Sequence, residues 1–293
     1  MSPRLAFFVV AATALFAISC GTPPASQTTH VSPSPTNVGY LSIGSIQRVY
    51  VTYRPPSAAA HSSLPVVIAL HGYTVGATWM ETNTHFDQLA DQDGFEVVYP
   101  QGEGNAWNAG RCCGHASGDD VAFIRAVIDE LTAHGDVDRT RVYVAGMSNG
   151  AFMAQRLACE LADRVTAVAS VSGSLVLDTC APSRPVPVLE IHGVDDDIVP
   201  LNGGMVAGLT TFPPTMSNMK AWAKRDSCAP SAAMSRDGIA SIYTWSHCRG
   251  GVTVVLEEVA GVGHTWFSPD DMPGEPDASK VAWAFFQRSQ PLG

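Results

Sequence analysis

Short apolar runs alternate with helix-like segments along most of the chain, and this alternation constrains the fold more than any other feature. Strands are predicted at Ile46–Tyr53, Leu64–Leu70, Phe95–Tyr99, Arg141–Ala145, Val165–Val171, Val186–Ile191 and Val252–Val259. Helices are predicted at Trp79–Gln92, from Asp120 onward, from Asn149 to about Leu161, at Met219–Arg225 and at Ala278–Arg288. A repeated strand-then-helix order produces a mainly parallel sheet with helices on both faces. We therefore expect one α/β domain over residues 39–293.

Residues 1–19 have the features of an export signal. Arg4 supplies a short basic start, and Leu5–Ile18 is an apolar run of 14 residues. A run of this length is short for a membrane span and typical of a signal-peptide core. The run leads into Ser19-Cys20, and the segment resembles a bacterial lipobox. The resemblance implies cleavage before Cys20 and attachment of lipid to its thiol.

Residues 20–38 combine Cys20 with a stretch that is rich in Pro, Ser and Thr. This composition is typical of an extended linker, because it offers little apolar surface to bury. We therefore expect a domain held through Cys20 at the outer face of the cell membrane. The alternative is an ordinary secretory signal with an incidental Cys20, which would give a secreted protein.

Charge and cysteine content narrow the functional class. The formal net charge is −10 and no run rich in Lys and Arg occurs, so nucleic acid is not an expected partner. Besides Cys20 the chain has Cys112, Cys113, Cys159, Cys180, Cys228 and Cys248. An even number of cysteines in an exported chain predicts disulfides, although the number alone leaves their pairing open. No Cys-x-x-Cys pair occurs, and we expect no metal site.

A Gly-x-Ser-x-Gly pattern lies between a predicted strand and a predicted helix. It reads Gly146-Met147-Ser148-Asn149-Gly150, directly after the apolar segment Val142-Tyr143-Val144. A serine at such a tight strand-to-helix turn forms a nucleophile elbow, in which the hydroxyl projects at the carboxyl end of the sheet. The context predicts that Ser148 is a nucleophile rather than a serine in a glycine-rich turn.

A serine nucleophile needs a base, and at an elbow of this kind the chain order is Ser, acid, His. Three histidines follow Ser148, namely His192, His247 and His264. His264 lies after the last predicted strand and before the terminal helix, which is where the base belongs. His192 precedes any plausible acid, and His247 adjoins Cys248 in a strand-like stretch. We therefore predict His264 as the base.

The acid should follow the strand Val186–Ile191, where Asp195, Asp196 and Asp197 are consecutive. One of them must accept a hydrogen bond from the imidazole of the base. Spacing alone does not choose among the three.

The negative oxygen that forms during attack on a carbonyl needs backbone donors. The amide of Asn149, next to the nucleophile, is one candidate. The other is the amide of Tyr73, in the loop that begins His71-Gly72-Tyr73 after the strand Leu64–Leu70. His71 precedes the nucleophile in the chain, and we expect it to shape this loop rather than to act as the base.

Five ordered motifs resemble the polyhydroxybutyrate depolymerase and feruloyl esterase group, which is similar to carbohydrate esterase family 1. They are the segment from Trp107 to Gly114, the segment from Asp119 to Phe123, the elbow at Ser148, His192-Gly193 with Asp196, and Gly263-His264-Thr265-Trp266. The resemblance covers about residues 40–290 and implies an α/β-hydrolase fold. It also implies Asp196 as the acid, because in this group the acid falls four residues after the His of His-Gly. The flanking Asp195 and Asp197 depart from the group's usual sequence, so either could replace Asp196.

The resemblance carries further expectations. It implies a disulfide between Cys228 and Cys248, and it leaves the pairing of the other four cysteines open. Trp107 and Trp266 are candidate walls of the substrate pocket, with a place in the core as the alternative. Asp119 and Asp120 are expected to cap and brace the following helix. Together with the lipobox, the motifs resemble those of a bacterial lipoprotein esterase.

We therefore expect a monomeric serine esterase that hydrolyses a carboxylic ester through an acyl-enzyme without a cofactor. Polyhydroxybutyrate-type, feruloyl and acetyl esters all fit the motifs, and the sequence does not identify the natural ester. The alternatives are a peptidase or acyltransferase with the same triad, and a catalytically silent surface-binding protein that keeps the fold.

Overall fold

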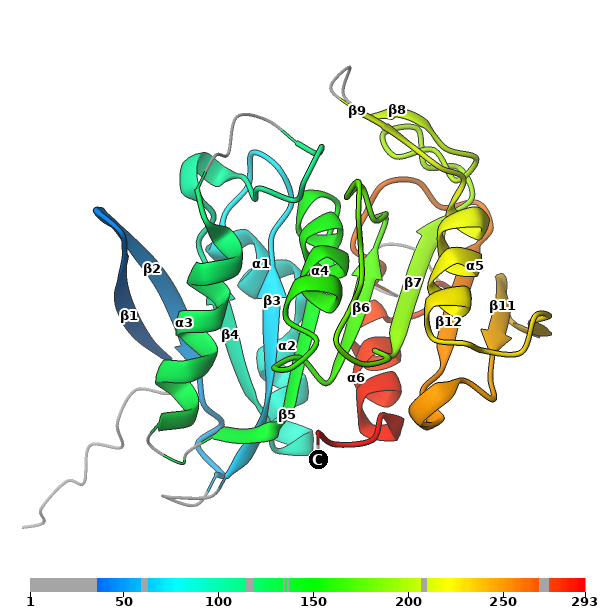
Figure 1. The fold of residues 1–293 in the computed structure, drawn as a ribbon. Helices are drawn as coiled ribbons and strands as arrows, with labels where there is room; N and C mark the ends of the chain where they lie inside the picture. The colour runs from blue at the N-terminus through cyan, green and yellow to red at the C-terminus, as the bar shows by residue number, and fades with distance from the viewer. Residues whose placement is uncertain are drawn as a thin grey trace, which may run out of the picture. The chain divides into compact units, whose positions relative to one another are not determined.

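The computed structural model describes residues 36–58, 63–113, 118–133, 135, 137–206, 210–268 and 274–292. The predicted signal segment and Cys20 lie outside these ranges. Within them, no helix is long and apolar enough to cross a membrane. Ten strands form one sheet in the order β1-β2-β4-β3-β5-β6-β7-β12-β11-β10, and β8 pairs with β9 separately (Figure 1).

The strands are β1 (Thr36–Ile43), β2 (Ile46–Tyr53), β3 (Leu64–Leu70), β4 (Glu96–Pro100), β5 (Val137–Met147), β6 (Ala167–Val171), β7 (Val188–Gly193), β8 (Gly204–Val206), β9 (Thr210–Phe212), β10 (Ala233–Asp237), β11 (Ala240–Trp245) and β12 (Val254–Val259). The α-helices are α1 (Ala77–Thr84), α2 (Phe86–Asp93), α3 (Asp120–Ala133), α4 (Asn149–Glu160), α5 (Thr215–Arg225) and α6 (Ala278–Arg288). Short 3-10 turns occur at Glu103–Asn105 and Arg249–Gly251.

The centre of the sheet is parallel and is covered on both faces. Strands β4, β3, β5, β6, β7 and β12 pair in parallel, whereas β1, β2, β10 and β11 add antiparallel margins. Helices α3, α4 and α5 pack into one hydrophobic cluster, and α1, α2 and α6 pack into a second. The two groups of helices lie on opposite sides of the sheet in Figure 1. The predicted mainly parallel sheet with helices on both faces is therefore confirmed.

Buried parallel strands were predictable because both of their faces are covered. Every residue of β3 is buried, which explains its continuous apolar sequence. By contrast, β1 begins at Thr36, inside the segment 20–38 expected as linker, and its residues alternate between half-buried and exposed. All residues of β10 are exposed. Such marginal strands lack the apolar run by which a buried strand is recognised.

The segment Trp79–Gln92, predicted as one helix, forms two. Helix α1 ends at Thr84 and α2 begins at Phe86, because His85 between them has a left-handed backbone conformation with φ of 54°. A right-handed helix cannot continue through a residue in that conformation.

Three disulfides join the six cysteines of the described domain. Cys228 is bonded to Cys248, the pair that the family resemblance implied. The pairs that the sequence left open are Cys159 with Cys180, and the adjacent Cys112 with Cys113. The bond from Cys159 fastens the end of α4 to the connection that follows β6, so it braces the helix that begins beside Ser148.

Candidate active site

Three of the predicted site residues lie at the same edge of the sheet. Ser148 directly follows β5, Asp196 follows β7, and His264 follows β12. These strands belong to the parallel part of the sheet, so their carboxyl ends share one edge. The fold therefore brings together residues that are far apart in the sequence.

Ser148 sits in the strained turn that a nucleophile elbow requires. Its backbone has φ of 53° and ψ of −120°, and its N–H donates to the carbonyl of Val171 at 2.9 Å. The flanking glycines leave no space for a side chain. A Cβ on Gly146 would lie 2.2 Å from the carbonyl oxygen of Gly150, and a Cβ on Gly150 would lie 2.1 Å from that of Leu70. The two glycines thus allow β3, β5 and α4 to approach closely around the serine.

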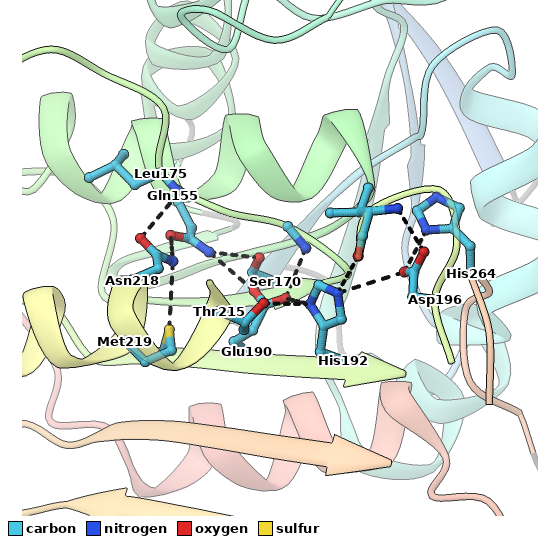
Figure 2. Close-up of polar contacts among 12 residues, drawn as sticks. Gln155, Ser170, Leu175, Glu190, His192, Asp196, Thr215, Asn218, Met219 and His264 are labelled. Atoms are coloured by element: carbon cyan, nitrogen blue, oxygen red, sulfur yellow. Dashed lines mark hydrogen bonds and ion pairs between the residues drawn. The ribbon is translucent and has the colours of Figure 1, made fainter. Parts of the chain in front are cut away.

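Asp196 and His264 form a hydrogen-bonded pair. Nδ1 of His264 donates to Oδ2 of Asp196 at 2.8 Å (Figure 2). The other carboxylate oxygen, Oδ1, accepts the backbone N–H groups of Ile198 at 3.0 Å and Val199 at 2.7 Å. The Asp196 side chain is fully buried, whereas 14% of the His264 side chain is exposed. The carboxylate is therefore fixed on both oxygens, and the imidazole can meet a substrate.

The three consecutive carboxylates have different environments. Asp195 and Asp197 are exposed, and Asp196 is buried against His264. Burial alone would raise the pKa of Asp196, but the hydrogen bond and charge of His264 and the Val199 N–H outweigh it and lower the pKa below its ordinary value. Asp196 is thus held as a carboxylate. The structure places it where the family resemblance expected the acid.

The loop after β3 lies against the nucleophile. A Cβ on Gly72 would be 3.5 Å from Cβ of Ser148, so the following residue, Tyr73, is next to the reaction centre. On the other side, Asn149 is the first residue of α4, and the first N–H groups of a helix have no partner within it. The amides predicted to stabilise a negative oxygen therefore flank Ser148.

The side chain of Asn149 has a scaffold role that the sequence did not predict. Its Oδ1 accepts the N–H of Trp107 at 2.7 Å, and its Nδ2 donates to the carbonyl of Trp107 at 3.0 Å. This two-way contact fixes the loop that carries Trp107 to the start of α4. The side chain of Asn149 thus holds the Trp107 segment against the residue that follows Ser148.

Trp107 and Trp266 lie in the core, which differs from the expectation that their rings wall a substrate pocket. Trp107 is 0% exposed and its indole N–H donates to the carbonyl of His71 at 2.9 Å. Trp266 is 3% exposed, donates to Oγ of Ser279 at 3.1 Å and packs edge-on against Phe86. The hydrogen bonds and ring contacts of both residues are made inside the protein, which is the alternative that the sequence had left open.

His71 is a buried, neutral brace of the Tyr73 loop. Its Nε2 accepts the N–H of Gly102 at 2.9 Å, which leaves the ring proton on Nδ1 to bond the carbonyl of Gly72 at 2.8 Å. Burial lowers the pKa of His71 and keeps the ring neutral. Its hydrogen bonds fix the position of Gly72, in agreement with the loop-shaping role expected from the sequence.

The predicted brace at the start of α3 is also present. Asp119 accepts the N–H of Ala122 at 2.9 Å, and the buried Asp120 pairs with Arg48 at 2.7 Å and accepts the N–H of Asn108 at 2.7 Å. These contacts join the start of α3 to Arg48 of β2 and to Asn108, the residue after Trp107. Within the described ranges, no group of three or more His, Cys, Asp or Glu side chains is arranged to hold a metal ion.

A buried polar network behind Asp196 was missed by sequence reasoning. Glu190 and His192 lie two residues apart on β7, both are 0% exposed, and they connect Gln155 of α4 with Asp196 (Figure 2). A signal was available, because two ionisable residues interrupt the otherwise apolar strand. They point to a buried polar partner within the fold.

Comparisons with known proteins agree with this geometry. The family model described as "Esterase PHB depolymerase" matches residues 48–241. Feruloyl esterase B of Piromyces equi is 34% identical over 72% of this chain, but the match spans 41% of that protein. A bifunctional acetylxylan esterase/xylanase of Neocallimastix patriciarum is 30% identical over 74% of this chain and 31% of its own length. The chain thus spans less than half the length of these two relatives.

A putative esterase of Nocardia uniformis subsp. tsuyamanensis is covered more fully, being 32% identical over 80% of this chain and 75% of its own length. Among solved structures, the acetyl xylan esterase from Aspergillus awamori superposes with a TM-score of 0.64, over 86% of this chain and 99% of that one, at 16% identity. This likeness shows the fold alone. The α/β-hydrolase fold that the motifs implied is confirmed by it.

Proposed function

The chain belongs to the esterase PHB depolymerase family, and from this membership we propose that it is a serine esterase that cleaves carboxylic esters through an acyl-enzyme. The observation that carries the proposal is the 2.8 Å hydrogen bond between His264 and the buried Asp196, at the sheet edge where Ser148 occupies an elbow. This is the arrangement of nucleophile, base and orienting acid that acyl transfer requires.

The proposed reaction has two halves. In the first, His264 removes the proton from Oγ of Ser148 as that oxygen attacks the ester carbonyl carbon, and the amides of Tyr73 and Asn149 stabilise the oxyanion. His264 then protonates the departing alkoxide as the ester C–O bond breaks. In the second half, His264 removes a proton from water, which attacks the acyl-enzyme, and returns a proton to Ser148 as the carboxylic acid leaves. Asp196 orients the imidazole throughout.

We propose that the ester carries an apolar acyl or alcohol group. Exposed apolar side chains occur in the loops that hold the site: Tyr73 is 39% exposed beside Gly72, and Val194 and Ile198 flank the Asp196 turn at 43% and 49%. Exposed apolar groups gathered around a reaction centre favour a ligand that covers them. We therefore expect hydroxybutyrate oligomers and feruloyl esters to be better substrates than acetylated sugars.

The test is a set of initial rates for the full chain and for Ser148→Ala. We expect hydrolysis of a short p-nitrophenyl ester by the wild type and a loss of about 10⁵-fold or more in kcat for the variant. Among natural esters, hydroxybutyrate oligomers or methyl ferulate should give a higher kcat/KM than acetylated xylose. Equal rates for Ser148→Ala and wild type would exclude the mechanism. Preference for peptides, or transfer to added alcohols in place of water, would favour the alternative enzyme classes.

We also propose that the protein acts outside the cytoplasm, held by lipid on Cys20. The disulfides Cys159–Cys180 and Cys228–Cys248 support an oxidising compartment, because such bonds are rare in reducing cytosol. Cells that express the full chain and are supplied with a labelled fatty acid should incorporate the label into the wild type and not into Cys20→Ser. Absence of label from the wild type, or equal labelling of both, would argue against the lipid anchor on Cys20.

A further inference from the structure

Both ring nitrogens of the buried His192 face hydrogen-bond acceptors. Nδ1 lies 2.8 Å from Oε1 of Glu190 (Figure 2). Nε2 lies 2.7 Å from the carbonyl oxygen of Val199. A carbonyl oxygen can only accept, so Nε2 carries a proton. A neutral imidazole has a single N–H and would then have no proton for Nδ1. The 2.8 Å contact between Nδ1 and Oε1 therefore needs a proton on one of the two atoms, either on Nδ1 in the imidazolium form of His192 or on Oε1 of Glu190.

Burial raises the pKa of Glu190, and the hydrogen bond and charge of His192 oppose that effect. The hydrogen bonds that Glu190 accepts argue that it is a carboxylate beside His192. The oxygen that faces His192, Oε1, also accepts the N–H of Gly173 at 2.8 Å. The protonated oxygen of a carboxylic acid is a poor acceptor for a second donor, whereas a carboxylate oxygen accepts both. The proton between Glu190 and His192 therefore belongs on the imidazole.

The second oxygen of Glu190 receives a donor whose orientation is fixed from outside. The indole Nε1 of Trp222 can only donate, and it lies 2.9 Å from Oε1 of Gln155. That contact determines which end of the Gln155 amide is the oxygen. The opposite end, Nε2, must then donate to Oε2 of Glu190 at 3.1 Å. Glu190 thus accepts from Gly173, Gln155 and His192.

We propose that His192 is a permanently charged, buried imidazolium that pairs with Glu190 and acts as a positioning residue for Asp196. This inference rests on the proposed esterase mechanism, in which Asp196 orients His264. Nε2 of His192 lies 3.7 Å from Oδ2 of Asp196, the same oxygen that accepts from His264. The carboxylate therefore lies between two imidazole rings, and the inner one supplies a fixed positive charge.

The peptide group of Val199 couples the two residues mechanically. Its carbonyl accepts from Nε2 of His192, and its N–H donates to Oδ1 of Asp196 at 2.7 Å. A movement of His192 would therefore shift the turn that holds the Asp196 carboxylate. His192 sets both the charge and the position of the acid.

Other charged groups around His192 are also carboxylates. Glu258 is its register partner on the neighbouring strand β12, and Thr215 of α5 contributes a hydroxyl 3.5 Å from Nδ1. Apart from His264 at Asp196, no basic side chain is paired with this cluster within the described residues. Burial would lower the pKa of His192, but the hydrogen bond and charge of Glu190, together with Val199 and Asp196, outweigh it and raise the pKa.

The direct test is the protonation state of His192 in the full chain labelled with ¹⁵N-histidine. We expect both ring nitrogens to carry protons at pH 7 and at pH 8, with two slowly exchanging N–H signals. A ring with one unprotonated nitrogen at pH 7 would overturn the proposal. The measurement needs no activity, so it can fail while the proposed esterase function stands, and it can succeed while that function fails.

A second test measures whether the positive charge of His192 affects catalysis. His192 lies between Glu190 and Asp196 in Figure 2, with Nε2 at 3.7 Å from Oδ2 of Asp196, so replacing the imidazolium removes a positive charge beside the acid that orients His264. In His192→Gln the acid limb of the pH profile of kcat/KM should move to higher pH, by about half a unit or more. A variant that alters packing alone would lower the rate without moving the limb.

Asn218→Leu supplies the matched control. Asn218 is buried at the far end of the same network and donates to Oε1 of Gln155 at 2.9 Å, but it carries no charge. We expect this variant to be less stable and to keep the wild-type acid limb. An unmoved limb in a folded His192→Gln, or an equal shift in both variants, would overturn the positioning role. If His192→Gln does not fold, the labelled wild type still decides the protonation state.

Discussion

At the residue scale, only one of three consecutive aspartates has the environment that the acid of a catalytic triad needs. Asp195, Asp196 and Asp197 have the same functional group, but the turn after β7 buries only the middle one of these three and aims it at His264. The backbone N–H groups of Ile198 and Val199 complete its shell. The residue type alone therefore does not determine the triad acid. Burial of the carboxylate and the backbone N–H groups that hold it do.

This difference predicts a sharp contrast among three conservative substitutions. Asp196→Asn should lower kcat about 10³- to 10⁴-fold, because an amide cannot stabilise the imidazolium of His264 and favours the wrong tautomer. Asp195→Asn and Asp197→Asn are matched controls, since both side chains are exposed, and they should stay within about threefold of wild type. Initial rates on a p-nitrophenyl ester would check this. A comparable loss in either control would move the acid to that neighbour.

Some residues of the site could be predicted from the sequence and others could not. Ser148 and His264 could be predicted because each follows a recognisable strand in the required chain order. Physical spacing could not choose among the three carboxylates, since the choice depends on the path of a short turn. The positions of Trp107 and Trp266 could not be predicted either, because an aromatic side chain near a motif fits a pocket and a core equally well.

At the element scale, the site depends on the close approach of β3, β5 and α4. Gly150 lies where α4 begins, and a Cβ there would be 2.1 Å from the carbonyl oxygen of Leu70 at the end of β3. We expect Gly150→Ala to lower the free energy of unfolding by about 3 kcal/mol or more, because backbone must shift to accept the methyl group.

Gly263→Ala is the control for that prediction. An added Cβ there finds its nearest neighbour, the carbonyl oxygen of Asp195, at an ordinary 3.7 Å. Its cost should stay below about 1 kcal/mol. Denaturant unfolding of both variants provides the comparison, and equal losses would show that the close approach is not what constrains the elbow.

Strand β12 carries a buried carboxyl that makes stability depend on pH. Burial, with a smaller contribution from Asp237, raises the pKa of Glu257 to about 7. The folded state thus holds this proton more tightly than the unfolded state. The stabilising effect is complete below the unfolded pKa, near 4.3, and is lost as pH rises through about 7.

Glu257→Gln should therefore raise the free energy of unfolding at pH 8 by on the order of 2 kcal/mol and change it little at pH 4. Urea unfolding of wild type and variant across this range would measure the difference. A Glu257→Gln curve parallel to that of wild type would contradict the assignment.

At the scale of the whole molecule, buried parallel strands and covalent links surround the site. The sequence predicted the central strands because both of their faces are covered, and it missed β1, β10 and β11 because their surfaces are partly or wholly exposed. The sequence marks Glu190 and His192, which interrupt the otherwise apolar β7, but it does not show that Gln155 and Trp222 complete their network. The network joins residues from two helices and a strand, and no pattern within a short stretch of sequence predicts contacts between them.

The Cys228–Cys248 disulfide should contribute measurably to the free energy of unfolding. It closes a loop with a sequence separation of 20 residues, for which chain entropy predicts about 3 kcal/mol of stabilisation. Replacing both cysteines by Ala should lower the free energy of unfolding by about that amount while the Ser148 site remains active at low temperature. An unchanged unfolding midpoint would show that the unfolded chain is not restrained by the bond.

Covalent labelling distinguishes an activated Ser148 from the other hydroxyl groups of the protein. A fluorophosphonate reacts with an activated serine hydroxyl, and mass spectrometry of digested protein locates the adduct. We predict one adduct per chain, on Ser148, absent in Ser148→Ala and formed far more slowly in Asp196→Asn. An adduct on another residue, or no adduct on the folded wild type, would contradict the account.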